Sequence, residues 1–183
     1  MLPRKGHRGD QLLVLCDTAL CGLFRILNTR ATIIRIARLE LAGENPHRSA
    51  LMRLRRIYNP SSYDAMILLL GVDDLRQSPE ISDLKKRYED VLHLATTCYR
   101  MPVFINEAAP RIDDLAPRVP QAREALYAAA EPYPDVTVIS LQPLDNLQSH
   151  LNRNNGVTLT SRGTLRFMKI LIEHIPQLQV AYP

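Results

Sequence analysis

The 183-residue chain is predicted to be an α/β protein, a three-layer α/β/α sandwich on one five-stranded parallel sheet. Two observations predict this fold class. Short apolar runs rich in branched residues recur along the chain, and longer amphipathic stretches with helical spacing separate them. This alternation is typical of consecutive βα units, in which a helix follows each strand and covers a face of the sheet. The 46% of hydrophobic residues is enough for one buried core.

Each expected element follows from its local pattern, and the strands are expected in the flavodoxin-like order 2-1-3-4-5. The expected strands are QLLVLC (11–16), ATIIRI (31–36), DAMILLL (64–70), PVFIN (102–106) and DVTVIS (135–140). The expected helices are the amphipathic segments near 18–28, 47–58, 80–97, 119–131 and 161–175. Ligands of such sheets meet the loops at the carboxyl ends of the strands. Those loops are expected to start at Asp17, Ala37, Gly71, Glu107 and Leu141.

The domain organisation is expected to be simple. Residues 1–9, MLPRKGHRG, are polar and basic without a period, so we expect a flexible segment there and a single domain over 10–183. No apolar run approaches the ~20 residues of a membrane span, which favours a soluble protein. Three cysteines without CxxC spacing indicate reduced thiols and a cytoplasmic location. We expect no cofactor, and no metal site at the adjacent Asp73 and Asp74, because consecutive side chains diverge.

Three strand-end segments carry motifs. They are CDTAL after the first strand, GVDDL after the third, and NNGVTLTSRGTLRFM leading into the last helix. In order, spacing and placement they resemble the Gly-Asp-Ser-Leu, Gly-x-Asn-Asp and Asp-Gly-x-His blocks of the SGNH (GDSL-type) hydrolases, a family of esterases and lipases. The resemblance spans nearly the whole chain. It implies the same sandwich and a site at the strand ends.

The catalytic positions that the resemblance implies are degenerate. The family's serine, asparagine, aspartate and histidine correspond to Thr18, Asp73, Asn155 and Thr158. A threonine is a nucleophile only when a base takes its proton, and Thr158 is no base. A carboxylate at Asp73 puts negative charge where the reaction must develop negative charge. We therefore predict a pseudoenzyme. The alternative is an SGNH-type esterase with an atypical active site, for which His150 is a candidate base.

The charge of the chain suggests a nucleic-acid partner. The formal net charge is +4, and arginines far outnumber the four lysines, Lys5, Lys85, Lys86 and Lys169. The planar guanidinium group binds phosphate and stacks on bases, so this composition favours RNA. The chain has no Trp and no aromatic pattern of a base-stacking platform. Recognition through phosphates with modest sequence selectivity is expected.

The last expected helix carries the main candidate RNA surface. Arg162, Arg166 and Lys169 recur at i, i+4 and i+7 and form one basic stripe. Arg153, in the loop before this helix, adds positive charge where a hydrolase would hold its acid and base. A helix N-terminus there also offers N–H groups to an anion. The inward face is expected to hold Leu165, Met168 and Ile172.

A further basic group flanks the second expected strand. It consists of Arg30, Arg35 and Arg38. If this strand lies at the edge of the sheet, the charges either block pairing with other strands or follow a phosphate backbone. Both interpretations stay open.

The loss of the catalytic residues, together with the arginine-rich surface, resembles the catalytically degenerate OSK-type domains of insect germ-plasm organisers. That resemblance implies RNA binding to mRNA 3′ untranslated regions, germ-granule proteins as further partners, and cytoplasmic germ granules as the location, without a membrane. A protein-docking module, whose old cleft binds a peptide or helix, is a further alternative.

Overall fold

The computed structural model describes residues 11–17, 35–41, 63–70, 74–78, 80–145, 148–151 and 157–181. Its strands are β1 (Gln11–Asp17), β2 (Arg35–Leu41), β3 (Ala65–Leu69), β4 (Val103–Asn106) and β5 (Val136–Ile139). They form a parallel five-stranded sheet in the order β2-β1-β3-β4-β5, which is the predicted order.

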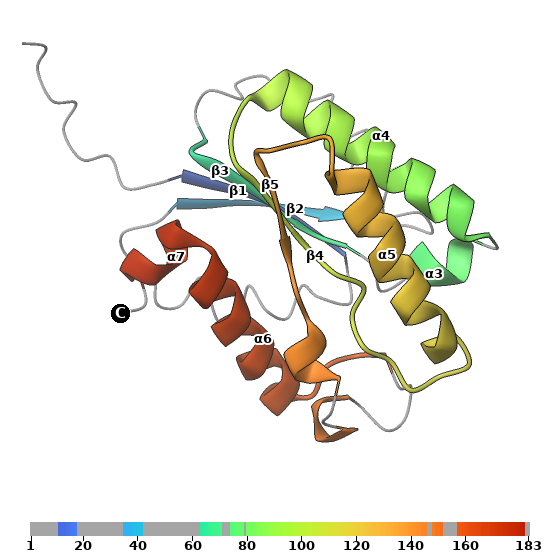
Figure 1. The fold of residues 1–183 in the computed structure, drawn as a ribbon. Coiled ribbons are helices and arrows are strands. Elements are labelled where there is room, and N and C mark those ends of the chain that lie inside the picture. The colour runs from blue at the N-terminus through green and yellow to red at the C-terminus, as the bar shows by residue number, and fades with distance from the viewer. Residues whose placement is uncertain are drawn as a thin grey trace, which may run out of the picture.

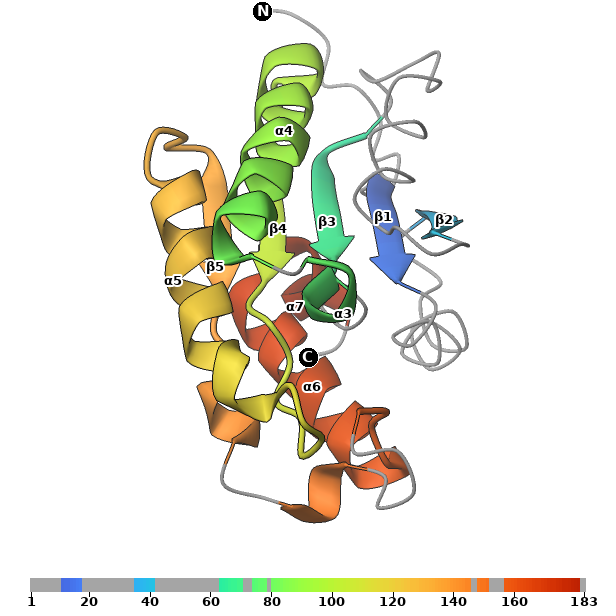
Figure 2. The same cartoon turned by 90° about the vertical axis from the view of Figure 1, so that its right-hand side faces the viewer.

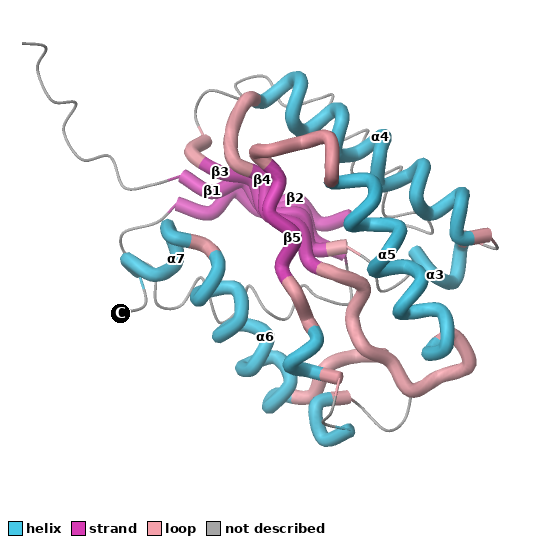
Figure 3. Tube along the Cα trace, in the orientation of Figure 1, coloured by secondary structure: helices cyan, strands magenta, loops and turns pink. Residues whose placement is uncertain are grey.

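Helices cover both faces of this sheet (Figure 1). The helices are α3 (Asp74–Gln77), α4 (Ile81–Tyr99), α5 (Val119–Ala130), α6 (Ser161–His174) and α7 (Pro176–Ala181), with short 3₁₀ turns at Ala116–Arg118, Gln142–Leu144 and Gln148–His150. Figure 3 shows α4 and α5 on one side of the magenta strands and α6 with α7 on the other. The described part of the chain is thus an α/β/α sandwich. None of its helices has the length and apolar character needed to cross a membrane.

The position of β2 corrects the sequence prediction of a strand at 31–36. The strand instead comprises seven residues from Arg35, which pair in parallel with the whole of β1. An edge strand has one neighbour, so its start is fixed by that pairing and the apolar run alone misplaces it. As a consequence, Ala37 lies inside the strand and does not open a loop. Arg35 and Arg38 likewise belong to the strand, at the predicted edge of the sheet.

The two faces of β1 belong to two different cores. Leu13 and Leu15 pack with α4 and α5, whereas Leu12 and Val14 pack with α6 and α7. All four side chains are at most 1% exposed. Side chains alternate across a strand, so a strand covered on both sides must be apolar at every position. This explains why the continuous run in the sequence was a reliable strand signal.

Each long helix buries one stripe of side chains along its length. The buried residues of α4 recur every three to four positions, as in Leu84, Tyr88, Val91 and Ala95. The buried stripe of α5 is rich in alanine, with Ala122, Ala125, Ala129 and Ala130. The segments α3 and α7 were not predicted, because four and six residues are too few to show a helical period.

The carboxyl ends of the strands form one edge of the molecule. Figure 2 shows the arrowheads of β1 and β3 pointing to the same end, where α3 lies. At this edge the side chain of Asn106 extends the pairing of β4 with β3. Its Oδ1 accepts the Leu70 N–H at 3.0 Å and its Nδ2 donates to the Leu70 carbonyl at 2.8 Å. Asn106 therefore holds the start of the loop after β3 in place.

Candidate functional site

The predicted site residues divide into three groups. Those outside the described residues are Thr18, Arg30, Asp73, Arg153 and Asn155. For Arg35 and Arg38 the structure describes the backbone within β2 and not the side chain. Thr158, Arg162, Arg166 and Lys169 are described in full. The gathering of the four degenerate catalytic positions at the strand ends therefore stays a prediction.

The segment that carries Thr158 is anchored to the preceding turn. Thr160 is the N-cap of α6, and its Oγ1 accepts the Gly163 N–H at 3.2 Å. The same hydroxyl donates to the Ser149 carbonyl at 2.9 Å, and the Thr160 N–H donates to the His150 carbonyl at 2.8 Å. Thr158 thus lies, half-buried, two residues before a fixed helix start. The position that the family resemblance assigns to its base is structurally defined, but a hydroxyl group occupies it.

The first turn of α6 packs directly on the backbone of the turn that contains His150. A Cβ atom placed on Gly163 would come within 2.3 Å of the His150 carbonyl oxygen. Real Cβ atoms do not approach backbone oxygen that closely, so glycine is required here for a steric reason. This close approach buries His150 under the start of α6.

His150 is too enclosed to be a catalytic base in this arrangement. The residue is 2% exposed, and its Nδ1 has no hydrogen-bond partner among the described residues. Burial lowers the pKa of His150, and the positive charges of Arg162 and Arg166 lower it further, against a backbone hydrogen bond to Leu144 that raises it. The ring is therefore neutral and shielded at neutral pH. A buried nitrogen without accessible surface is unable to take a proton from a substrate-facing hydroxyl.

The basic stripe of α6 is exposed as predicted. Arg162, Arg166 and Lys169 all face solvent. Lys169 lies 3.9 Å from the carboxylate of Glu173, and both side chains are more than half exposed, so this pair is weak. Among the described residues, neither arginine forms an ion pair. The stripe thus offers two uncompensated guanidinium groups next to the first turns of the helix.

The inward face of α6 corrects one prediction. Met168 is 4% exposed and Ile172 packs against the same core, as expected. Leu165, however, is 59% exposed. The buried face of α6 is set by Gly163 and Phe167, and Leu165 lies between them in sequence on the opposite side of the helix. An exposed leucine therefore stands within the basic surface.

Sequence reasoning missed a buried carboxylate at the same edge of the sheet. Glu107 directly follows β4 and is 1% exposed. Its Oε1 accepts the Tyr127 hydroxyl at 2.8 Å, and its Oε2 accepts the Ser140 hydroxyl at 3.0 Å and the Leu141 N–H at 2.8 Å. Burial, followed by the hydrogen bond to Glu107, raises the pKa of Tyr127 to about 12. The signal in the sequence was an acidic residue directly after an apolar strand, and this residue was predicted only to start a loop.

Arg123 completes this network. Its Nε lies 3.5 Å from Glu107, and its two terminal nitrogens bind both oxygens of Asp145 at 2.6 and 2.8 Å. Burial lowers the pKa of Arg123, but the hydrogen bonds and charge of Asp145 and the charge of Glu107 raise it overall. The two oxygens of Glu107 accept three protein donors, and through them the network joins β4, α5 and the loop after β5.

A pocket of about 210 Å³ lies beside this network. Its polar lining consists of Arg111, Arg123 and Asp145, between Pro110 and Pro120. Arg111 is bonded to Asp113, and that hydrogen bond holds the pKa of Asp113 below its usual value. Each arginine is thus matched by an acid, so the pocket has no excess charge for an anion. Within the described ranges, no three His, Cys, Asp or Glu residues gather as metal ligands.

Comparison with solved structures identifies the fold of this chain. No protein-family model and no curated protein matches the sequence. Among solved structures, a member of the lipolytic G-D-S-L family from Veillonella parvula matches with a TM-score of 0.73 at 16% identity, over 92% of this chain and 99% of that one. The chain has an SGNH hydrolase-like fold.

Two further SGNH-like matches agree. A GDSL-like lipase from Bacteroides thetaiotaomicron matches with a TM-score of 0.67 at 12% identity, over 96% of this chain and 92% of that one. A psychrotrophic esterase from Pseudoalteromonas matches with a TM-score of 0.68 at 12% identity, over 93% and 98%. At these identities the likeness extends to the SGNH-like fold alone.

Proposed function

We propose that the chain is a non-catalytic SGNH hydrolase-like domain that binds RNA through the basic stripe of α6. The observation that carries the proposal is the exposure of Arg162 and Arg166, which form no ion pair within the described residues. Residues at i and i+4 share a helix face and lie about 6 Å apart along its axis. Two guanidinium groups in this arrangement suit an extended polyanion, because each can form a bidentate contact with a phosphate.

The biological role follows from the sequence resemblance. The order of the motif blocks and the joint loss of serine, asparagine and histidine resemble the C-terminal domain of Oskar, the insect germ-plasm organiser. On this basis the RNA is an mRNA 3′ untranslated region, and the domain takes part in mRNA localisation in cytoplasmic germ plasm. Germ-granule proteins are the further partners, and Arg153, Arg30, Arg35 and Arg38 extend the RNA surface.

The alternative function is an SGNH-type esterase with an atypical active site. The solved neighbours named as lipases and an esterase support this alternative more directly than they support RNA binding. The residues of this chain argue against it. His150, the candidate base, is buried with its Nδ1 shielded, and Thr158 supplies only a hydroxyl group. Without a base the hydroxyl of Thr18 keeps its proton and stays a poor nucleophile.

Fluorescence anisotropy with a labelled single-stranded RNA at several salt concentrations tests the proposal. Binding should weaken steeply with salt, because phosphate contacts release counterions. Each contact to single-stranded RNA contributes roughly 0.7 to the slope of log K against log salt, so Arg162→Gln with Arg166→Gln should flatten it by about 1.4. Arg162→Glu with Arg166→Glu should weaken binding further through repulsion of the phosphates.

A matched control lies on the other face of the sheet. Lys85 and Lys86 of α4 are exposed, and Lys85→Glu with Lys86→Glu changes the net charge by the same amount. If the α4 variant weakens RNA binding as much as the α6 variant, the interaction follows net charge and the α6 stripe is not the site. Wild-type protein that binds no RNA at low salt would overturn the proposed function.

A further inference from the structure

A pocket of about 530 Å³ lies between α4 and the end of α5, on the face of the sheet opposite to α6. It forms because α5 ends at Ala130 while α4 continues to Tyr99. Beyond α5 the chain turns back toward β5, and the Tyr133 N–H donates to the Ala130 carbonyl at 2.9 Å. The side of α4 at this level therefore faces a turn and not a helix, which leaves the space open.

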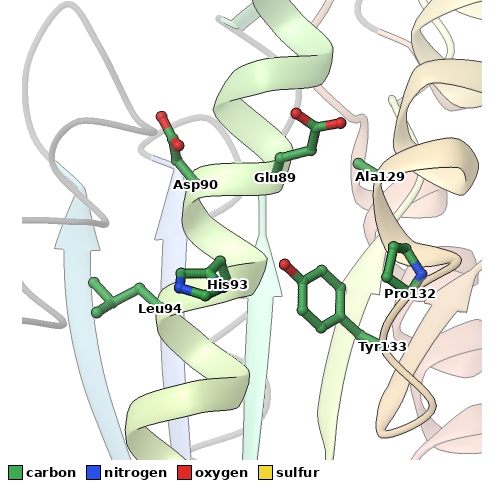
Figure 4. A pocket seen from close by; sticks show the side chains of 7 residues that line it. All are labelled: Glu89, Asp90, His93, Leu94, Ala129, Pro132 and Tyr133. Carbon is green, nitrogen blue, oxygen red and sulfur yellow. The ribbon is translucent and has the colours of Figure 1, made fainter.

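The walls of this α4–α5 pocket are chemically mixed. Figure 4 shows the Tyr133 ring reaching from the α5 side toward His93 of α4, with Glu89 one turn earlier on α4 extending toward Ala129. Leu94, Ala129 and Pro132 supply apolar surface, and Asp90 adds a carboxylate at the rim. The pocket thus combines an aromatic ring, aliphatic surface and negative charge.

The carboxylates of this pocket are available to a ligand. Among the described residues Glu89 pairs with Lys85 alone, at 3.5 Å, and both side chains are about 45% exposed, so the pair is weak in water. Asp90 forms no ion pair in the described part of the chain. The lining of this pocket thus carries two carboxylates beside apolar surface, and a cation with an apolar stem is complementary to it.

We propose that the α4–α5 pocket binds an arginine side chain from a basic peptide segment of a partner protein. The guanidinium group stacks on the Tyr133 ring and donates two hydrogen bonds to the Glu89 carboxylate. Its methylene stem packs on Ala129 and Pro132, which lie on the same side as Tyr133 in Figure 4, as long cationic side chains do on apolar surface. Arginine fits better than lysine because its planar group stacks and forms paired hydrogen bonds at once.

This site is independent of the proposed RNA surface. The α6 stripe packs on one core of the sandwich and the α4–α5 pocket on the other, with the sheet between them. A peptide in the pocket leaves the stripe free, so the protein binds RNA and peptide together. The two proposals can therefore fail separately: RNA binding can be absent while the arginine peptide binds, and peptide binding can be absent while RNA binds.

The test uses fluorescent peptides in which three arginines are separated by glycines, titrated against the whole protein by anisotropy. Peptides with lysine or with citrulline, an uncharged arginine isostere, are compared under the same conditions. The arginine peptide should bind most tightly and the citrulline peptide at least about tenfold more weakly, since a guanidinium contact to an aromatic ring and a carboxylate contributes that much. Equal binding of the arginine and citrulline peptides, or no binding of the arginine peptide, overturns the proposal.

Two variants locate the interaction. Glu89→Gln keeps the size of the side chain without its charge, and Tyr133→Leu keeps apolar surface without the aromatic ring. Each should weaken arginine-peptide binding several-fold while leaving RNA binding unchanged. Glu124→Gln is the control, because Glu124 is an exposed glutamate of α5 outside this pocket. If Glu124→Gln weakens peptide binding as much as Glu89→Gln, long-range attraction explains the binding and the pocket does not. Amide NMR shifts on peptide addition should centre on His93 and Tyr133, and shifts elsewhere would overturn the assignment.

Discussion

The Cα of Gly163 lies so close to the backbone of His150 that a Cβ on this glycine would meet the His150 carbonyl oxygen at 2.3 Å. Alanine normally favours a helix over glycine by about 1 kcal/mol. Here a backbone oxygen blocks the added methyl group, so Gly163→Ala should lower the free energy of unfolding by about 1–3 kcal/mol, as overpacking does. Urea denaturation measures this change. Ser161→Ala, at an exposed position of the same turn, should stay within about 0.5 kcal/mol of wild type.

A gain in stability for Gly163→Ala, of the size that helix propensity alone predicts, would show that the two segments are farther apart than described. The His150 ring signals in an NMR spectrum give a second measurement. They should shift in Gly163→Ala and not in Ser161→Ala.

Burial of His150 predicts a pH dependence of stability. Its folded-state pKa lies below the value of about 6.5 expected in the unfolded chain. The unfolded state therefore binds the proton first as pH falls, and stability is lost from about pH 6.5 down toward the folded pKa, by at most about 1.4 kcal/mol per pH unit. His150→Gln should remove this loss. Urea denaturation of the wild type and of His150→Gln at several pH values measures the free energy of unfolding. If the difference between the two proteins is the same at every pH in this range, the prediction is wrong.

The charges of α6 contribute to that low pKa, so they offer a separate check. Arg162→Gln removes one positive charge that disfavours the protonated ring, and should raise the pKa of His150. An NMR titration of the ring protons measures the change. Lys85→Gln, on the other face of the sheet, should leave the titration unaltered.

The buried Glu107 depends on its donors. Tyr127→Phe removes the hydroxyl that binds Oε1 at 2.8 Å and leaves that oxygen without this donor. An unsatisfied buried polar atom costs about 1–3 kcal/mol, so unfolding should become easier by that amount. Tyr133→Phe is the matched control, since its hydroxyl forms no hydrogen bond within the described residues, and it should change stability by less than about 0.5 kcal/mol. Equal effects of both variants would contradict the role of Glu107.

The same hydrogen bond predicts behaviour in alkali. The pKa of Tyr127 is raised to about 12, above the usual value of 10.0. The unfolded chain loses this proton first, so the stabilisation is complete below about pH 10 and is lost as pH rises toward 12. Tyr127→Phe should reduce the loss of stability in this window. An ultraviolet absorbance titration of the variant should show one late-titrating tyrosine fewer, with Tyr99, whose pKa burial also raises, still titrating late.

Catalysis offers the test between the two candidate functions. Purified protein should hydrolyse p-nitrophenyl acetate no faster than an equal amount of inert protein, because His150, the candidate base, is buried and Thr158 is no base for Thr18. Turnover that disappears in a Thr18→Ala variant, and persists in Arg162→Gln, would establish the esterase alternative.

The sequence by itself determined the central strands and the long helices. The run at 11–16 predicted β1, and the amphipathic segments at 80–97 and 119–131 predicted α4 and α5 to within two residues at each end. These signals are local and strong, because a strand covered on both faces is apolar throughout and a helix on a sheet has one apolar stripe. The same periodicity predicted the exposed stripe of α6.

Only the tertiary structure decided which segments far apart in the chain meet. It moved β2 to Arg35–Leu41, because an edge strand is positioned by its pairing with β1. It brought Tyr127 and Ser140 to the carboxylate of Glu107, and Gly163 to the backbone of His150. It also showed that Leu165 is exposed, whereas the apolar pattern predicted that this side chain faces inward. These contacts depend on how two helices and a turn pack over the sheet, and no local spacing of residue types encodes such distances.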